Sequence, residues 1–327
     1  MKSGNFFKKL LIIFLVFVGI GALLKMGGDF FGESEKRVSA KNTVLQLDMN
    51  GVILNGKKFI KNLKKYKDDN RVKAIVININ SPGGSVGPSQ EIYHEIKRVR
   101  DELKKPIVCV TTGVMASGAY YSAVACDKIV VAPGALVGSI GVIMEFANLE
   151  KLYDWAKVSR YSITSGKFKD SGAEYRGMRD DEKALFQNMI NEVYGQFKGT
   201  VMKERKLKEE TMNEYADGRV FTGTSAVKLG FADQEGFLDD AVKLAADLAK
   251  LGDNYEVFEI PKKKMSIFDF GGRDSEDDLN SMAEYADLLK GKLPGAAAGI
   301  NAEGAVKYLL RTQYLNQPMF IMPGYWE

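Results

Sequence analysis

One serine of this chain lies in a setting that suits a nucleophile. Ser117 stands between Ala116 and Gly118 in the stretch TTGVMASGAYY, directly after the apolar, strand-like run PIVCV. Nucleophilic catalysis by a serine requires a nearby base that takes the hydroxyl proton. The chain contains a single histidine, His94, so an imidazole base could come only from this residue.

His94 is expected on the surface. It lies two residues after Ile92 and two before Ile96, off the three-and-four spacing of the apolar stripe, which puts it between Tyr93 and Glu95 on the solvent side of a helix. A Ser-His-Asp triad is therefore disfavoured, although the order of triad members varies between folds.

Lysine is the alternative base. A solvated lysine has a pKa of about 10.4, and desolvation lowers that pKa by roughly 3 units or more, which makes a substantial fraction of the amine neutral and basic. The segment SITSGKFKD provides two candidates, Lys167 and Lys169, beside a small-residue turn. Judged by residue type alone, both could equally be ordinary solvent-exposed lysines of a loop.

Two glycine-containing segments could bind an anion. NSPGGS follows the β-branched run KAIVINI and offers backbone N–H groups at close approach, as an oxyanion hole requires, although a plain strand-to-helix turn looks the same. SGKFKD is no phosphate-binding loop, since Tyr161 occupies the first glycine position and Phe168 follows the lysine. GVMASGA also departs from the G-x-S-x-G elbow.

Alternating strand-like and helix-like segments must position these motifs. The runs TVLQLDMNGVI, KAIVINI, PIVCVTT, KIVVA, GSIGVIM and RYSIT predict strands, and FIKNLKKY, GAYYSAVAC and NLEKLYDWAK predict helices. A long helix is expected over residues 180–206, with an inward stripe of Leu185, Phe186, Met189, Ile190, Val193 and Phe197. This alternation predicts an α/β fold with a mainly parallel sheet.

The N-terminus is typical of a membrane anchor. Lys8 and Lys9 precede fifteen apolar residues, Leu10 to Leu24. As a helix this run is about 22 Å long against a hydrocarbon core of roughly 30 Å, and Lys25 can snorkel to extend it. No good small-x-small site precedes the charged GESEKR stretch, which favours a retained anchor over a cleaved signal peptide. The basic residues lie mostly before the run, so the remainder is expected outside the cytoplasm.

The composition disfavours several kinds of partner and cofactor. The net charge of +4 is spread evenly along the chain, which disfavours nucleic acid as a partner. Cys109 and Cys126 sit in apolar runs and are expected as buried free thiols rather than a disulfide. Two cysteines and one histidine lack the ligands of a typical zinc site, and we expect neither metal nor cofactor.

The predicted organisation has four parts. Residues 1–28 form a cytoplasmic stub and anchor, residues 29–42 a linker, residues 43–250 the main domain, and residues 251–327 a C-terminal extension. Residues 251–305 are rich in structure-breaking residues with segregated charge, and are expected to be extended or mobile.

The order of the motifs is more specific than any one of them. NSPGGS, MASGAYY, GSIGV, SGKFKD, DGRVFTG and AVKLGFAD follow one another between Val44 and Ala249 and resemble the SppA-type signal peptide peptidases, a bacterial serine peptidase family. The resemblance implies a ClpP/crotonase-like fold of repeated β-β-α units and a Ser-Lys dyad. It assigns the nucleophile to Ser117 and the general base to Lys169.

The resemblance also implies supporting roles and partners. The backbone N–H groups of Gly84 and Gly118 would bind the oxyanion, and Ser139 of GSIGV would orient the lysine amine. The chain departs from the family at Ala119, where a second glycine is frequent, and in its long C-terminal extension. Expected partners are cleaved signal peptides and other apolar peptides, the bacterial cytoplasmic membrane, and further copies of the chain. These copies would form a ring or dome in which neighbouring protomers share each site, with a single-pass anchor and the catalytic domain outside the cytoplasm.

Two other functions stay open. A crotonase-type acyl-CoA hydratase or isomerase would use similar glycine-rich oxyanion sites but would be cytoplasmic, with acidic catalytic groups. A catalytically inactive membrane scaffold is the other.

The C-terminal tail is unexpectedly apolar. Within residues 313–327 it carries Leu315, Met319, Phe320, Ile321 and Trp326, which would be costly to leave in water. We expect it to dock in a substrate groove of its own chain or of a neighbour, as a plug or a self-processed end. Deletion of residues 306–327 should then raise peptidase activity.

Overall fold

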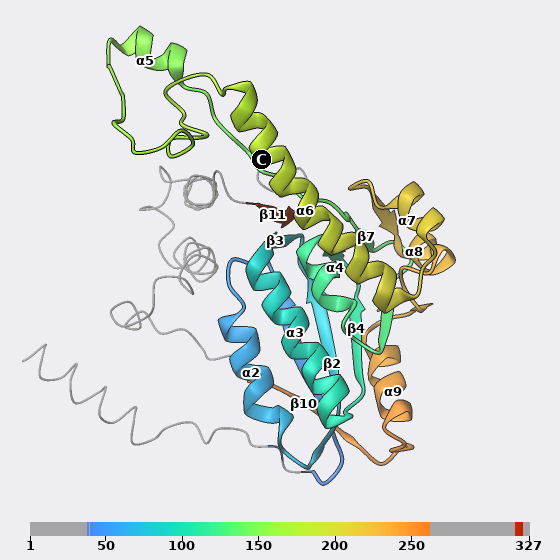
Figure 1. Ribbon diagram of the computed structural model, residues 1–327. Coiled ribbons are helices and arrows are strands. Elements are labelled where there is room, and N and C mark those ends of the chain that lie inside the picture. The colour runs from blue at the N-terminus through green and yellow to red at the C-terminus, as the bar shows by residue number, and fades with distance from the viewer. Residues whose placement is uncertain (1–37, 39, 262–317, 323–327) are drawn as a thin grey trace, which may run out of the picture. The chain divides into compact units, whose positions relative to one another are not determined.

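The computed structural model describes residue 38, residues 40–261 and residues 318–322 (Figure 1). The expected anchor and most of the expected linker lie outside these described residues. Among the residues that are described, no helix combines the length and apolarity needed to span a bilayer.

A six-stranded sheet forms the centre of the domain, in the order β10-β1-β2-β4-β6-β9. Each neighbouring pair of strands is parallel. The strands are β1 (Thr43–Asn50), β2 (Val72–Asn80), β4 (Ile107–Thr111), β6 (Lys128–Val131), β9 (Gln234–Glu235) and β10 (Glu256–Glu259). The predicted α/β fold with a parallel sheet is confirmed.

Helices cover both faces of this sheet (Figure 1). On one face, α2 (Lys57–Lys67), α3 (Val86–Leu103) and α4 (Gly118–Ala123) pack against residues such as Ile75 and Ile77 of β2. On the other face, α9 (Leu238–Leu248) packs against Ala74 and Val76. Because side chains alternate between faces along a strand, the continuous apolar run of β2 serves both helix layers.

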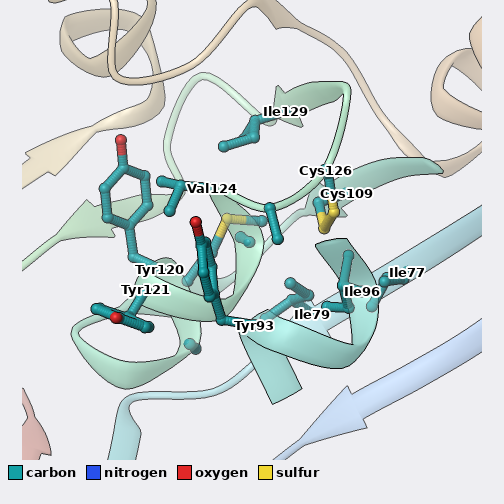
Figure 2. Packing of buried hydrophobic residues seen from close by; sticks show 14 of the residues in the cluster. Ile77, Ile79, Tyr93, Ile96, Cys109, Tyr120, Tyr121, Val124, Cys126 and Ile129 are labelled. Carbon is teal, nitrogen blue, oxygen red and sulfur yellow. A yellow bond between two sulfur atoms is a disulfide. The ribbon is translucent and has the colours of Figure 1, made fainter. Parts of the chain in front are cut away.

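The two cysteines form a disulfide inside the first of these layers. Cys109 of β4 and Cys126, just beyond α4, have Cα atoms 6.0 Å apart and are joined through their sulfur atoms (Figure 2). The expectation of free thiols was wrong. The end of α4 returns to the strand that precedes it, which brings two apolar runs together in a way that their sequence separation does not reveal.

Two smaller sheets lie at the carboxyl ends of the central strands. One contains β5 (Val114–Ala116), β7 (Leu136–Gly138) and β8 (Val220–Thr222), and the other pairs β3 (Gly83–Ser85) with β11 (Met319–Ile321) in antiparallel fashion. Both β10 and β11 belong to the segment expected as a C-terminal extension. β10 pairs with β1, so residues 256–259 are an ordered edge strand rather than the extended or mobile chain expected there.

The remaining helices are α5 (Glu150–Ala156), α6 (Asp180–Arg205), α7 (Glu209–Tyr215) and α8 (Gly223–Leu229). Residues 149–179, which we call the arm, contain α5 and lead into α6; α5 lies beyond the N-terminal end of α6 (Figure 1). The run RYSIT forms no strand, so that prediction was wrong. The predicted inward stripe of α6 is correct in part: Phe197 is buried, Met189 is exposed, and the other four residues are half-buried.

Candidate active site

The backbone holds Ser117 at a sharp junction between a strand and a helix. β5 ends at Ala116 and α4 begins at Gly118, so Ser117 is the single residue between them. Its φ of 51° and ψ of −117° are strained for a residue with a side chain. Its Oγ is buried and has no hydrogen-bond partner among the described residues. A strained, unpartnered hydroxyl at a strand-to-helix turn is the arrangement used by serine nucleophiles.

The amide of Gly84 points away from the strand segment at Ile53. The carbonyl of Gly83 and the N–H of Ser85 are both used by the backbone of Ile53, at 2.8 and 2.7 Å. Since backbone groups alternate in direction along a strand, the N–H and C=O of Gly84 face the opposite edge of β3. The turn that carries Ser117 lies near that edge.

Gly84 and Gly118 lie close together. A Cβ added to Gly118 would lie 3.2 Å from the backbone nitrogen of Gly84 and 2.3 Å from Oγ of Ser89. The position of Gly118 is therefore closed to any side chain by the close approach of α3. Two backbone amides close together beside a serine are suited to bind the oxyanion of a tetrahedral intermediate.

Strand β11 lies in this same place. Phe320 pairs with Gly84 in the antiparallel register, and the backbone of Met319 exchanges hydrogen bonds of 2.9 and 3.0 Å with Ile143 on the other side. The residues Met319–Ile321 are therefore docked on their own domain next to Ser117, as expected of the apolar tail.

Ser139 lies close to Ser117 through the backbone. The N–H of Ser117 donates to the carbonyl of Gly138 at 2.7 Å, and Ser139 is the next residue. Ser139 is buried with a φ of 52°.

His94 is exposed, as expected, but Tyr93 and Glu95 beside it are buried, so the predicted solvent face of α3 is narrower than expected.

The two candidate lysines lie in the arm. Lys169 is exposed and follows the turn at Gly166, and no hydrogen bond or ion pair joins it to Ser117 among the described residues. Lys167 forms an ion pair of 2.7 Å with Asp181 of α6. Among the residues that the structure describes, neither lysine therefore contacts the Oγ of Ser117.

A buried carboxylate ties the lysine loop to the start of α6. Glu182 is fully buried and accepts hydrogen bonds from both terminal nitrogens of Arg176, at 2.9 and 2.5 Å, and from the backbone N–H of Arg179 at 2.9 Å. Arg176 in turn binds the side chain and the carbonyl of Asp170, the residue after Lys169. The bonds from Arg176 hold the pKa of Glu182 well below its usual value, at about 2.

Sequence reasoning missed three parts of this site. Nothing in the sequence marks Ile143 as part of the site except its place after GSIGV. Nothing in the sequence indicates the strained backbone of Ser117. Glu182 could have been suspected as the acidic residue of a capping position three residues after Arg179, but its burial depends on Arg176 folding back over it. Within the described part of the chain, no group of three or more metal-binding side chains forms a metal site.

Comparisons with known proteins find similarity to peptidases. The family model of peptidase family S49 matches residues 100–252, and the model of Clp protease matches residues 54–135. A putative protease of Synechocystis sp. is 36% identical over 256 residues, which cover 78% of this chain and 91% of that protein. A putative protease of Methanocaldococcus jannaschii is 33% identical over 76% of this chain and 84% of that protein. A putative signal peptide peptidase SppA of Enterococcus faecium is 29% identical over 72% of each.

The fold and the matches define the class as a serine peptidase with a Clp-like core. Within that class the chain belongs to peptidase family S49. The resemblance inferred from the ordered motifs is thereby confirmed.

Proposed function

We propose that this protein is a membrane-anchored endopeptidase that uses Ser117 as nucleophile and Lys169 as general base. The observation that carries the proposal is the position of Ser117, whose buried Oγ has no hydrogen-bond partner in the described part of the chain and which lies close to the backbone amides of Gly84 and Gly118. The second supporting observation is the exposure of the arm that bears Lys169.

The arm and α6 support assembly with further copies of the chain. The arm carries exposed apolar side chains at Leu152, Trp155, Val158, Tyr161, Ile163 and Phe168. Ile163 is 96% exposed and Trp155 is 80% exposed, which is unusual for residues of this size in water. A neighbouring copy that covers this surface would bring the arm's lysine to a serine of another protomer. Removal of water around a lysine amine favours its neutral form, which is the form that acts as a base.

The mechanism is acyl transfer. The amine of Lys169 takes the proton of Ser117 as its Oγ attacks the substrate carbonyl, and the amides of Gly84 and Gly118 bind the oxyanion. The carbon–nitrogen bond then breaks, and the lysine returns the proton to the leaving amine. Water hydrolyses the ester with the same lysine as base and regenerates Ser117. Ser139, next to the residue that binds the Ser117 amide, is suited to orient the lysine.

The substrates we propose are cleaved signal peptides and other apolar peptides bound in extended form. The similarity to a putative signal peptide peptidase of Enterococcus faecium supports this substrate class. The apolar run from Leu10 to Leu24 supports a retained single-pass anchor in the bacterial cytoplasmic membrane, with the peptidase domain outside the cytoplasm. Repeated β-β-α units, which the order β2-β3-α3 and β4-β5-α4 supports, and a ring or dome of protomers complete the proposal.

A covalent probe for active-site serines tests the dyad. Wild-type protein should be labelled, Ser117→Ala should not, and Lys169→Ala should lose most of the labelling. Lys167→Ala is the matched control, two residues away in the same loop, and should be labelled as the wild type is. Labelling that persists in Ser117→Ala would refute the nucleophile, and labelling lost in Lys167→Ala but kept in Lys169→Ala would refute the base.

A further inference from the structure

Helix α2 presents a face made of lysines. Its apolar residues Ile60, Leu63 and Tyr66 are buried in the core of the domain. At 3.6 residues per turn, the opposite side of the helix is occupied by exposed residues that all carry a long cationic side chain. These residues, which we call the lysine face, are Lys57, Lys58, Lys61, Lys64 and Lys65. The helix contains no acidic residue.

This concentration of positive charge is specific to α2 among the long helices around the sheet. Residues 57–71 contain seven lysines or arginines and two aspartates. The neighbouring α3 contains three lysines or arginines and four acidic residues, and α9 on the other face of the sheet contains one lysine and three acidic residues. Figure 1 shows α2 at the outer end of its helix layer, beyond α3. The lysine face therefore points out from the edge of the domain.

Nearby carboxylates do not balance this charge. The buried side chain of Glu95 in α3 lies 3.9 Å from the amine of Lys64 and 3.5 Å from that of Lys67, so one carboxylate is shared by two lysines. Lys58 and Lys61 form no ion pair with any residue that the structure describes. The lysine face therefore keeps a net positive charge that an extended anionic partner can balance.

The chain enters the domain beside the end of α2. The N–H of Thr43, at the start of β1, donates to the carbonyl of Arg71, just after α2, at 2.9 Å. The segment from Leu24, the last residue of the apolar run, to the buried Val38 spans at most about 50 Å even when fully extended. If the apolar run is the membrane anchor, this tether keeps the lysine face within reach of the bilayer surface.

We propose that the lysine face of α2 lies on anionic phospholipid headgroups of the membrane that holds the anchor. A lysine near an anionic bilayer multiplies the affinity for that surface roughly fivefold, and a flat array of lysines needs no shaped pocket to act in this way. The contact also sets the distance of the site from the bilayer, because Ile53, three residues before the N-terminal cap of α2, binds the backbones of Gly83 and Ser85. This inference rests on the proposed function only for the anchor that tethers the domain.

The test uses the full-length wild-type chain in nanodiscs of phosphatidylcholine alone or of phosphatidylcholine with about one-third phosphatidylglycerol. An uncharged amine-reactive ester is added, and the rate of acylation of each lysine is followed by mass spectrometry. The anchor is the same in both discs, so a difference in rate reports the headgroup charge.

The lysines of the face should react at least about threefold more slowly in the anionic discs. Lys203, Lys228 and Lys243 are exposed lysines of α6, α8 and α9, and as internal controls they should react at equal rates in both discs. Salt at about 0.5 M shortens the Debye length to about 4 Å and should remove the difference.

Variants separate charge from residue type. Glutamine at Lys57, Lys58 and Lys61 together should remove most of the slower reaction of Lys65 in anionic discs, whereas arginine at the same three positions should preserve it. Glutamine at the three control lysines makes the same change in net charge and should leave the slower reaction of Lys65 as in the wild type.

Two results would overturn the inference. Equal rates for the lysine face in both discs would show that it makes no contact with anionic headgroups. Equally slow rates in both discs would show that protein, such as a second copy of the chain, covers it instead. Failure of the chain to copurify with discs would refute the proposed anchor alone, and the same comparison of rates is then made with the chain added to vesicles of the two compositions.

Discussion

Neutralising Glu182 is expected to loosen the loop that carries Lys169 without unfolding the domain. In Glu182→Gln the new side chain can still accept a hydrogen bond from the backbone N–H of Arg179, as glutamine does at this capping position. It cannot balance the guanidinium of Arg176, which also holds the side chain and carbonyl of Asp170. The substitution therefore removes mainly the negative charge that pairs with Arg176, and leaves the other hydrogen bonds in place.

The magnitude follows from the pKa of Glu182. Arg176 lowers this pKa from 4.5 to about 2, which corresponds to at most about 3 kcal/mol of stabilisation. The side chain of Arg176 is 23% exposed, so solvent screening reduces the net effect to about 1–2 kcal/mol. A loss of this size in the positioning of the loop should lower kcat/KM about 5- to 30-fold.

The pH dependence gives a second readout with a defined sign. Because the folded-state pKa lies below the unfolded one, the stabilisation by Glu182 is present above pH 4.5 and is lost as pH falls toward 2. The difference in the free energy of unfolding between wild type and Glu182→Gln, measured by urea denaturation, should therefore shrink to about half or less between pH 7 and pH 3.

Glu209→Gln provides the matched control. Glu209 is an exposed acidic residue in the first turn of α7, and its neutralisation should leave both kcat/KM and the pH dependence as in the wild type. The reasoning would be refuted if Glu182→Gln had wild-type kcat/KM, or if its loss of stability were as large at pH 3 as at pH 7.

Two other substitutions test the site and the core. Gly84→Ala places a Cβ 2.0 Å from the carbonyl oxygen of Ile53 and must displace the amide proposed to bind the oxyanion, so kcat/KM should fall about 100-fold or more. Gly87→Ala, with no atom within 4 Å of the added Cβ, is the control and should retain activity. Equal kcat/KM in the two variants would contradict the role of Gly84. Replacing Cys109 and Cys126 together by alanine opens a loop of 17 residues and should lower the free energy of unfolding, measured by urea denaturation, by about 2–3 kcal/mol. Wild-type protein in reductant should show a similar decrease. No decrease in either case would contradict a stabilising disulfide.

The sheet was predictable because its strands are short β-branched runs that recur between amphipathic helices. Residues such as Ile75 and Val76 have one stable arrangement, between two layers of helix, and the run alone indicates it. The exposed state of His94 was predictable for the same reason, from its offset relative to Ile92 and Ile96.

The arm was not predictable in this way. Tyr161 and Ile163 of RYSIT predict burial, but burial requires a partner surface, and both side chains are exposed in the described part of a single copy. The disulfide and the ion pair between Arg176 and Glu182 were not predicted for a related reason. Both depend on chain segments that meet only after folding. The register of β11 on β3 likewise depends on two edges, Ile143 and Gly84, whose backbone groups carry no sequence signal.

A mixing experiment tests most directly whether Ser117 and Lys169 of neighbouring copies form one site. Ser117→Ala and Lys169→Ala chains, each inactive alone, are unfolded together in equal amounts and reassembled, and peptide hydrolysis is measured. If each site takes its serine from one copy and its lysine from the next, random mixing makes about a quarter of the sites intact, and activity should return to about a quarter of wild type. Mixed assemblies of normal size that remain inactive would contradict a dyad shared between copies.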